Sequence, residues 1–247
     1  MNDNKELFAG KSEDYYKFRP SYPDEAVDWL RLKVTGDDVL DVGAGTGIFT
    51  QKLLPRFENV FAVEPNADMR RVFSAFLPEV CCSDCCGENT KFSDESFDLV
   101  TVAQAFHWLD AEKFKAEAKR ILRRAGKVAI IWNTSLKSDF TDARNRVCQQ
   151  YCPRFRFGHA GQLSVAEGDA FLRNVYFREV EFVSFSNPFV MDFCAFEGNI
   201  RSRSYSLLPQ DSEYECFMAE LKGVFEHYSV NNVVIEPQET QIYLGSF

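Results

Sequence analysis

Residues 39–47 read VLDVGAGTG, an apolar run that leads directly into three glycines at alternate positions. The apolar residues 39–42 predict a buried strand, and residues 50–57 predict a helix, so the glycines occupy a strand–loop–helix turn. There, glycines let the backbone approach a ligand at the carboxyl end of a sheet. The spacing Gly43-x-Gly45-x-Gly47 differs from the G-x-G-x-x-G of nicotinamide-binding proteins, and no lysine follows as in a phosphate-binding P-loop.

Glu64 ends the next apolar run, residues 60–63. An acid about 20 residues after such a glycine loop commonly binds ribose hydroxyls. The strand, the glycines, the helix and the acid together predict a nucleoside-binding α/β domain.

Apolar runs alternate with helical patterns through the first 132 residues. We expect strands at residues 39–42, 60–63, 80–82, 99–103 and 128–132. A helix between the second and third strands carries Met69, Val72, Phe73 and Phe76 on one apolar stripe, and Gly126 is a candidate helix stop before the fifth strand. This alternation predicts a parallel sheet with helices on both faces.

The second half of the chain departs from this pattern. Residues 134–175 are irregular, with helical stretches, and predict an insertion after the fifth strand. Residues 178–185 and 240–244 predict two further strands, the final pair antiparallel, and residues 214–228 predict an amphipathic helix. Seven strands result.

The amino-acid composition restricts the classes of partner that we expect for this protein. The chain has 247 residues, of which 45% are hydrophobic, enough for the core of one domain. Its 28 Lys and Arg against 37 Asp and Glu give a net charge of −9, which repels phosphate backbones, so we expect no nucleic-acid partner. No apolar run approaches the roughly 18 residues of a membrane span. The polar start, MNDNKELFAG, is unlike a signal peptide, so we expect a cytoplasmic protein, in which eight cysteines do not imply four disulfides.

Several stretches together resemble the class I S-adenosylmethionine-dependent methyltransferases, and within them the small-molecule group typified by trans-aconitate methyltransferase. They are YYKFRPSYPDEAVDWL, VLDVGAGTG, VEPNADM, FDLVTVAQAFHWLD, RILRRAGKVAIIWN and SRSYSLLP. The resemblance implies a Rossmann-like α/β fold with a seven-stranded, mostly parallel sheet, helices on both faces and an antiparallel last strand pair. It implies one domain over residues 1–247, with an N-terminal lid (1–35), a cofactor-binding core (36–133) and cap insertions (134–175 and 187–212).

The resemblance also implies a cofactor, S-adenosylmethionine, and residues that bind it. Asp41 and the loop from Gly43 to Gly47 are expected at its methionine part, and Glu64 at the ribose. Gln104, after the fourth strand, is expected near the amino-acid end. The full expected set is Tyr16, Arg19, Asp41, Gly43, Ala44, Gly45, Thr46, Gly47, Glu64, Pro65, Met69, Cys86, Gly87, Glu88, Gln104, Ala105 and His107.

Residues 81–86, CCSDCC, hold four thiols and a carboxylate. Neighbouring residues of a strand point to opposite faces, so four sulfurs cannot converge on one metal ion, and structural zinc sites draw ligands from two separated knuckles. We expect no metal here. The family places adenine beside this loop, so Cys86 and Gly87 fall at the adenine edge, where the family usually has Asp or Thr in place of Cys86.

Three residues are candidates for the chemistry: His107, Trp132 and Arg203. His107 follows the fourth strand and Trp132 ends the fifth, at the sheet edge where substrates bind. Arg203, with Arg19 and Arg201, could pair with an anionic acceptor, because arginine binds carboxylates through two hydrogen bonds. Tyr15, Tyr16 and Tyr22 accompany Arg19 in the segment that the family uses as a lid.

The reaction implied is methyl transfer to a small-molecule acceptor. A carboxylate oxygen needs no base, whereas a hydroxyl or carbon acceptor, as in the quinone-type methyltransferases, would need His107 as general base. A protein that binds S-adenosylmethionine without turnover is the third interpretation, and the glycine loop with Glu64 fits all three.

Overall fold

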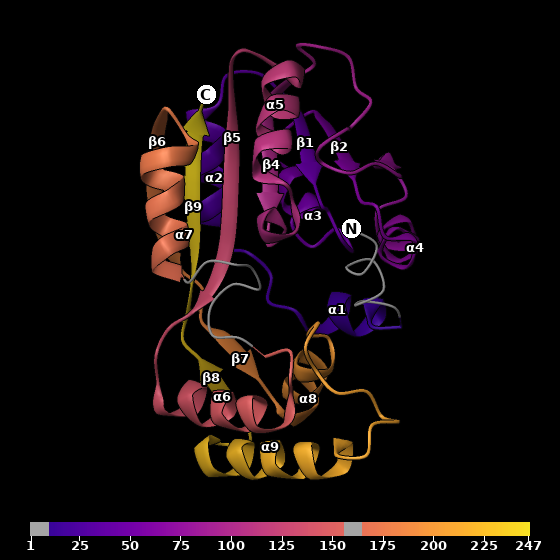
Figure 1. Cartoon of the computed structure of the whole chain (residues 1–247), viewed down its shortest axis with the longest axis vertical. Helices are drawn as coiled ribbons and strands as arrows, with labels where there is room; N and C mark the ends of the chain where they lie inside the picture. Colours follow the sequence, from indigo (N-terminus) through magenta and orange to yellow (C-terminus); the bar gives the residue numbers. More distant parts are fainter. Residues whose placement is uncertain (1–9, 156–164) are drawn as a thin grey trace.

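The computed structural model describes residues 10–155 and 165–247. Its main part is a seven-stranded sheet in the order β3-β2-β1-β4-β5-β9-β6 (Figure 1). The strands are β1 (Asp38–Val42), β2 (Asn59–Val63), β3 (Cys82–Ser83), β4 (Phe97–Ala103), β5 (Leu122–Ser135), β6 (Glu179–Ser186) and β9 (Gln238–Ser246). Strands β1 to β5 pair in parallel, and β9 runs antiparallel to both β5 and β6. The predicted Rossmann-like fold class is confirmed.

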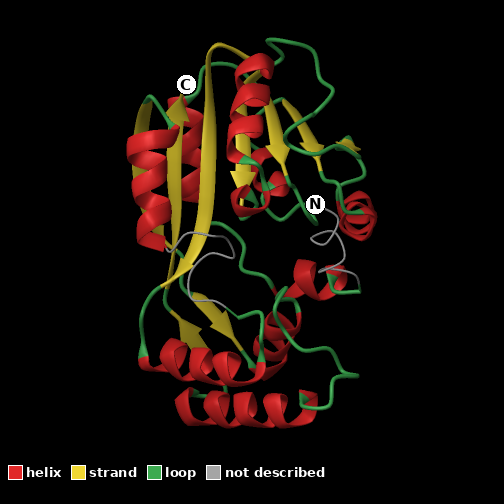
Figure 2. Ribbon diagram, viewed as in Figure 1, coloured by secondary structure: helices red, strands yellow, loops and turns green. Residues whose placement is uncertain are grey.

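Helices cover both faces of this sheet, as Figure 2 shows. One face packs against α2 (Asp24–Lys33) and α3 (Thr50–Leu53), through buried residues such as Leu30 and Leu53. The other face packs against α5 (Ala111–Ile121) and the π-helical turn η2 (Leu172–Tyr176), which α7 (Val165–Phe171) precedes. The strands have apolar residues on both faces because both are covered, which is typical of parallel sheets.

A second group of elements lies at one end of the sheet, and we call it the cap. It comprises α6 (Asp139–Tyr151), β7 (Phe189–Met191), α8 (Phe193–Arg201), α9 (Tyr214–Tyr228) and β8 (Val234–Glu236). These elements share their own apolar core, and β7 pairs with β8. The long strands β5 and β9 lead from the sheet towards the cap (Figure 1).

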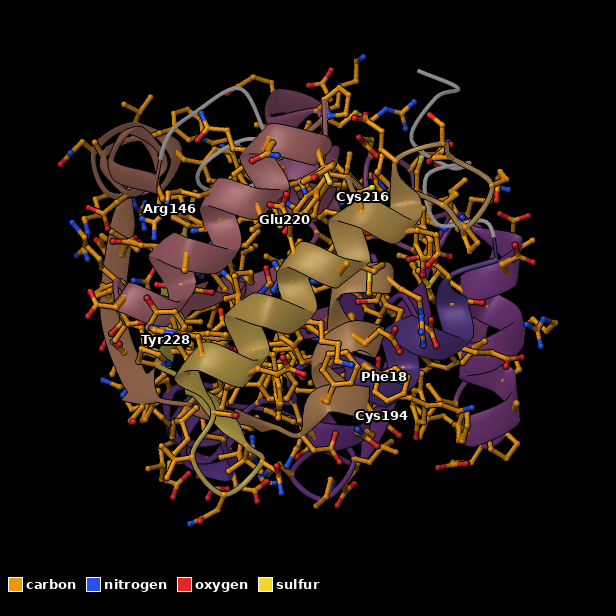
Figure 3. All side chains as sticks on the ribbon, turned by 90° about the horizontal axis from the view of Figure 1, so that it is seen from below. Phe18, Arg146, Cys194, Cys216, Glu220 and Tyr228 are labelled. Atoms are coloured by element: carbon orange, nitrogen blue, oxygen red, sulfur yellow. The ribbon has the colours of Figure 1, made fainter. Side chains whose placement is uncertain are left out.

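Helices α6 and α9 form the outer layer of the cap. Figure 3 shows α9, which carries Cys216, Glu220 and Tyr228, alongside α6, which carries Arg146. The Tyr151 hydroxyl donates to the Glu220 carboxylate at 2.6 Å, which ties the two helices at their solvent side. The helical insertion expected after the fifth strand therefore begins with α6, and α9 joins it from much later in the chain.

Helix α1 (Ser12–Phe18) bridges the cap and the sheet domain. Towards the cap, the Phe18 carbonyl accepts from the Asn199 side chain at 2.9 Å, and Arg201 pairs with Asp14 at 2.9 Å. Towards the sheet domain, the Tyr16 ring stacks on Phe76 of α4 (Ala67–Phe76), with ring centroids 3.7 Å apart. The N-terminal segment is thus held from both sides.

Three local predictions differ from the structure. The helix predicted for residues 50–57 ends at Leu53, because Pro55 has no N–H with which to continue the hydrogen-bond ladder. Gly126 does not stop a helix: α5 ends at Ile121, and Gly126 lies within β5, where the register with β4 shifts. Val80 and Cys81 precede β3 rather than begin it. None of the helices in the described ranges is long and apolar enough to span a bilayer.

Candidate active site

The glycine loop joins β1 to α3 with three residues in left-handed conformations. The φ values are +66° at Gly43, +57° at Gly45 and +89° at Gly47, which side chains rarely adopt. A Cβ at Gly43 would lie 2.6 Å from the Ala105 side chain. A Cβ at Gly45 would meet no atom within 4 Å. Gly43 is therefore required by packing, whereas the space beside Gly45 is open.

Glu64 follows β2 and holds the glycine loop in place. Its Oε2 accepts from the Gly45 backbone N–H at 2.9 Å, and its Oε1 accepts from the Asn66 N–H at 2.8 Å. Asn66 caps α4, because its side chain accepts from the Met69 N–H at 3.0 Å. The acid is thus fixed at the junction of two strand ends, with 8% of its surface exposed.

Asp41 lies beneath the loop, at the end of β1, and is buried. It accepts from the Thr50 hydroxyl at 2.6 Å and from the Thr101 hydroxyl at 2.8 Å. Burial raises the pKa of Asp41 to about 6; the two hydrogen bonds oppose that rise, and the Glu64 carboxylate adds to it. The site therefore contains a carboxyl group that titrates just below neutral pH.

The CCSDCC segment divides into surface and interior thiols. Cys81 and Cys86 are exposed, and Cys85 is buried. Burial raises the pKa of the Cys82 thiol to about 12, with smaller contributions from nearby carboxylates. Within the described ranges, no three His, Cys, Asp or Glu side chains are grouped as metal ligands. The next residues turn back towards the sheet, where Glu88 accepts from the Asp110 N–H at 2.8 Å.

A cavity of about 530 Å³ extends along this edge of the sheet and under the N-terminal segment. Its volume is in the range of roughly 300–1,000 Å³ usual for small-molecule sites. Most of the residues that the sequence singled out line it: Arg19, Asp41, Gly43, Ala44, Gly45, Thr46, Glu64, Pro65, Met69, Cys86, Gly87, Glu88, Gln104, Ala105 and Arg203.

Five of the singled-out residues do not line this cavity. Tyr16 stacks on Phe76 and faces α4. Gly47 packs beside Leu77 and Phe73, where a Cβ would lie 2.7 Å from Leu77. Arg201 pairs with Asp14 at 2.9 Å and with Glu197 at 3.0 Å. His107 and Trp132 complete the set.

His107 lies on the short 3-10 turn η1 (Phe106–Trp108), behind the cavity wall. Its ring stacks on Trp132, with centroids 5.3 Å apart and planes 29° apart, and its centroid lies 4.5 Å from that of Trp108. Trp132 is 5% exposed and belongs to the sheet core. The two predicted catalytic residues therefore support the wall, and Trp108 is the member of this group that lines the cavity.

Sequence reasoning missed or left unassigned part of the lining. Ser135 from β5 and Gln238 from β9 carry no motif, and Lys113 and Leu109 come from the region around the start of α5. Asn66 could have been recognised, since an Asn just before a predicted helix is a common N-cap. For Ser135 and Gln238, 103 positions apart, no local pattern reveals that the antiparallel pair β5–β9 places them opposite each other.

Two arginines face the cavity from the lid and the cap. Arg19 donates to the Ser202 hydroxyl at 2.8 Å and to its carbonyl at 3.1 Å. Arg203 donates to the Asn199 side-chain oxygen at 3.2 and 2.9 Å. Neither forms an ion pair with a carboxylate in residues 10–155 and 165–247. Burial lowers the pKa of Arg19, and the nearby Arg203 guanidinium lowers it further.

Comparison with known proteins shows which sequences this chain resembles. A family model described as a methyltransferase domain matches residues 40–130. An uncharacterised methyltransferase of Mycobacterium tuberculosis is 43% identical over 120 residues, which make up 49% of this chain and 49% of that protein. An uncharacterised methyltransferase-like protein of Schizosaccharomyces pombe is 35% identical over 125 residues, 49% of each chain. The match thus spans about half the length of these relatives.

Solved structures show the same fold over most of the chain. A candidate type II methyltransferase from Anaeromyxobacter dehalogenans superposes with a TM-score of 0.67 at 22% identity, covering 92% of this chain and 96% of that one. The YcgJ protein of Bacillus subtilis gives a TM-score of 0.56 at 17% identity, covering 91% and 100%. Residues 40–130 therefore match a methyltransferase domain, and the chain shares its fold with these solved structures.

Proposed function

We propose that this chain transfers a methyl group from S-adenosylmethionine to a carboxylate oxygen of an anionic small molecule. The observation that carries the proposal is the pair of arginines, Arg19 and Arg203, which line the cavity and form no salt bridge with a carboxylate among the described residues, although Arg203 lies near enough to Glu236 to lower the pKa of that carboxyl. The protein as a whole has a net charge of −9, so two such cations at one cavity favour a specific anion.

The residues at the β1 and β2 ends fit the cofactor. Gly45 leaves open space at the backbone, and an ionised carboxylate has about four acceptor positions, so Glu64 can keep its two backbone bonds and accept from ribose hydroxyls. The Thr46 hydroxyl is buried and has no hydrogen-bond partner within the described part of the chain, so a polar ligand group would satisfy it. Cys86 and Gly87 line the side proposed for adenine.

The cofactor supplies a methyl group already activated on a sulfonium sulfur. The protein therefore has to align the acceptor, exclude water and hold the acceptor's charge. Arg19 and Arg203 reach the cavity from the lid and the cap, so a bound carboxylate would contact both. Arginine suits this role because its planar guanidinium forms two parallel hydrogen bonds to a carboxylate.

The position of His107 favours a carboxylate acceptor over a hydroxyl or carbon acceptor. A general base must come within hydrogen-bond reach of the proton it removes, or act through one water. His107 lies behind Trp108 and stacks on Trp132, outside the cavity lining. A carboxylate is ionised at neutral pH and needs no base.

A methyl-transfer assay with radiolabelled S-adenosylmethionine tests the proposal. The acceptors would be a panel of small carboxylic acids, with phenols and amines as comparisons, and the product would be checked for a base-labile methyl ester. Label in an ester from one or more acids is the expected result. Label only in a phenol or amine would overturn the carboxylate acceptor, and binding without turnover on any acceptor would favour a non-catalytic binding protein.

A further inference from the structure

Ser135 and Gln238 face each other at the end of the cavity away from Glu64. They are directly paired positions of the antiparallel strands β5 and β9, and both line the cavity. Directly opposed residues of such a pair have Cβ atoms about 5 Å apart. In the strand order, β1 and β4 separate β2, which Glu64 follows, from β5 and β9. The two side chains therefore lie in the part of the cavity that the proposed function gives to the acceptor, away from Glu64.

The hydroxyl proton of Ser135 is committed to a buried carboxylate. Ser135 donates to Glu236, which has no exposed surface and also accepts from the buried Arg144 guanidinium. Burial opposes ionisation of Glu236, but the Arg144 guanidinium, with Arg203 and these hydrogen bonds, outweighs it and lowers the pKa of Glu236 to about 2. The ionised carboxylate can only accept. A hydroxyl has one proton, so Ser135 offers the cavity only its lone pairs.

Gln238 adds a second acceptor atom. Its Oε1 is buried and has no hydrogen-bond partner among residues 10–155 and 165–247, and the residue is 5% exposed. A buried polar atom without a partner destabilises the folded protein unless a ligand or water satisfies it. Two unused acceptors on paired strands call for a ligand group that donates hydrogen bonds.

Asn133, on the same face of β5 two positions before Ser135, shows the contrast. Its Oδ1 accepts from the Thr240 hydroxyl at 2.6 Å and from Asn187 at 3.2 Å. Its Nδ2 donates to the Ser21 carbonyl at 3.1 Å, which anchors the lid. Asn133 thus has protein partners for both ends of its amide, whereas the Gln238 Oε1 has none among the described residues.

From this arrangement we infer that the acceptor is a hydroxycarboxylate, whose carboxylate lies between Arg19 and Arg203 and whose hydroxyl shares its one proton between the Ser135 oxygen and the Gln238 Oε1 in a bifurcated hydrogen bond. The inference rests on the proposed function and adds the second functional group of the substrate. The charges nearby decide between a hydroxyl and an ammonium as the donor. Arg19, Arg203 and Arg144 are cations, and Glu236 is already paired with Arg144, so a neutral donor is favoured.

Matched acids that differ by one hydroxyl test the inference directly. The pairs are lactate and propionate, malate and succinate, citrate and tricarballylate, and salicylate and benzoate, each assayed for methyl transfer by the full-length protein. We expect a hydroxy acid to be the best substrate, with kcat/KM at least about tenfold above its partner, since a site built to bind a hydroxyl discriminates strongly against its loss.

Variants at the proposed hydroxyl site extend the test. Gln238→Met removes the acceptor at similar length and should reduce the preference to near unity, whereas Gln238→Glu keeps acceptor oxygens and should retain the preference. Ser135→Ala should weaken it. Ser184→Ala is the matched control, because Ser184 is a strand serine that also donates to a carboxylate but lies outside the cavity lining.

The outcomes separate this inference from the function on which it rests. Equal kcat/KM for both members of every methylated pair would overturn the hydroxycarboxylate and leave carboxylate methylation intact. A preference that survives in Gln238→Met and Ser135→Ala would also overturn it. If none of the acids is methylated, the proposed carboxylate acceptor is wrong, and this inference is wrong with it.

Discussion

The Glu64 carboxylate accepts the Gly45 backbone N–H at 2.9 Å, which joins the end of β2 to the glycine loop after β1. The acid and the loop are therefore one structural unit. The same carboxylate holds the Asn66 N–H, so α4 begins from the same anchor. A change at Glu64 should act on the cofactor site both directly and through the position of the loop.

Replacing Glu64 by Ala should weaken binding of S-adenosylmethionine and S-adenosylhomocysteine by at least about tenfold. Hydrogen bonds to a charged group contribute roughly 1.5–3 kcal/mol each, and about 1.4 kcal/mol corresponds to a factor of ten. Isothermal calorimetry measures the change. Glu58→Ala, at an exposed glutamate six positions earlier, should bind normally. Unchanged affinity in Glu64→Ala would contradict the assignment of Glu64 to the ribose.

Gly45→Val should abolish measurable cofactor binding, because its side chain would extend into the open space beside the loop. Strain at positive φ also contributes, so the matched control is Gly10→Val, where φ is +72° and a Cβ likewise meets nothing within 4 Å. Gly10 does not line the cavity. If both variants bind S-adenosylhomocysteine like the wild type, the loop does not contact the cofactor.

Arg203→Met should raise KM for the acid acceptor by roughly ten- to a hundredfold, the effect of losing one charge-assisted contact, and should leave cofactor affinity unchanged. Arg201→Met is the control two positions away, because Arg201 is paired with Asp14 and Glu197 outside the cavity. Partly exposed pairs of this kind contribute about 0–1 kcal/mol, so only a small loss of stability is expected there. Equal effects of the two substitutions on KM would argue against an arginine-bound carboxylate.

His107→Phe, which preserves a ring beside Trp108 and Trp132, should retain turnover within about tenfold of wild type. His107→Gln should also turn over, with a lower melting temperature because the stacked ring is lost. Removing a general base costs roughly a hundredfold or more. A loss of that size in both variants, with normal melting of His107→Phe, would favour a hydroxyl or carbon acceptor and His107 as the base.

The stability of the free protein should depend on pH through Asp41. Burial raises its pKa from 3.8 to about 6, so the folded state holds the proton more tightly than the unfolded state. The Asp41 contribution is complete below pH 3.8 and declines as pH rises to about 6, by on the order of 2–3 kcal/mol in the free energy of unfolding. Asp41→Asn should lack this decline when urea unfolding is compared at pH 4 and pH 6.5. If the free energy of unfolding changes equally with pH in the wild type and in Asp41→Asn, the predicted contribution of Asp41 is wrong.

The sequence determined the parts of the fold that depend on local pattern. Apolar runs between helical stretches define the parallel core because a strand buried on both faces must be apolar throughout. The glycine loop and Glu64 were recognisable because backbone approach and ribose binding require particular residues at a particular spacing. The boundaries at Pro55 and Gly126 were less reliable, since turns and strand register compete there with helix propensity.

The tertiary structure alone decided which polar residues line the cavity. Arg201 and Arg203 are equally polar in the sequence, and only the ion pair with Asp14 and the turn after α8 separate them. Ser135 and Gln238 meet because β9 returns antiparallel to β5, and the proton of Ser135 is oriented by Glu236, a residue of the cap. Such relationships arise from contacts between segments that are distant in the sequence, and a local pattern does not encode these contacts. The chemistry of a side chain depends on the partners that folding brings to it.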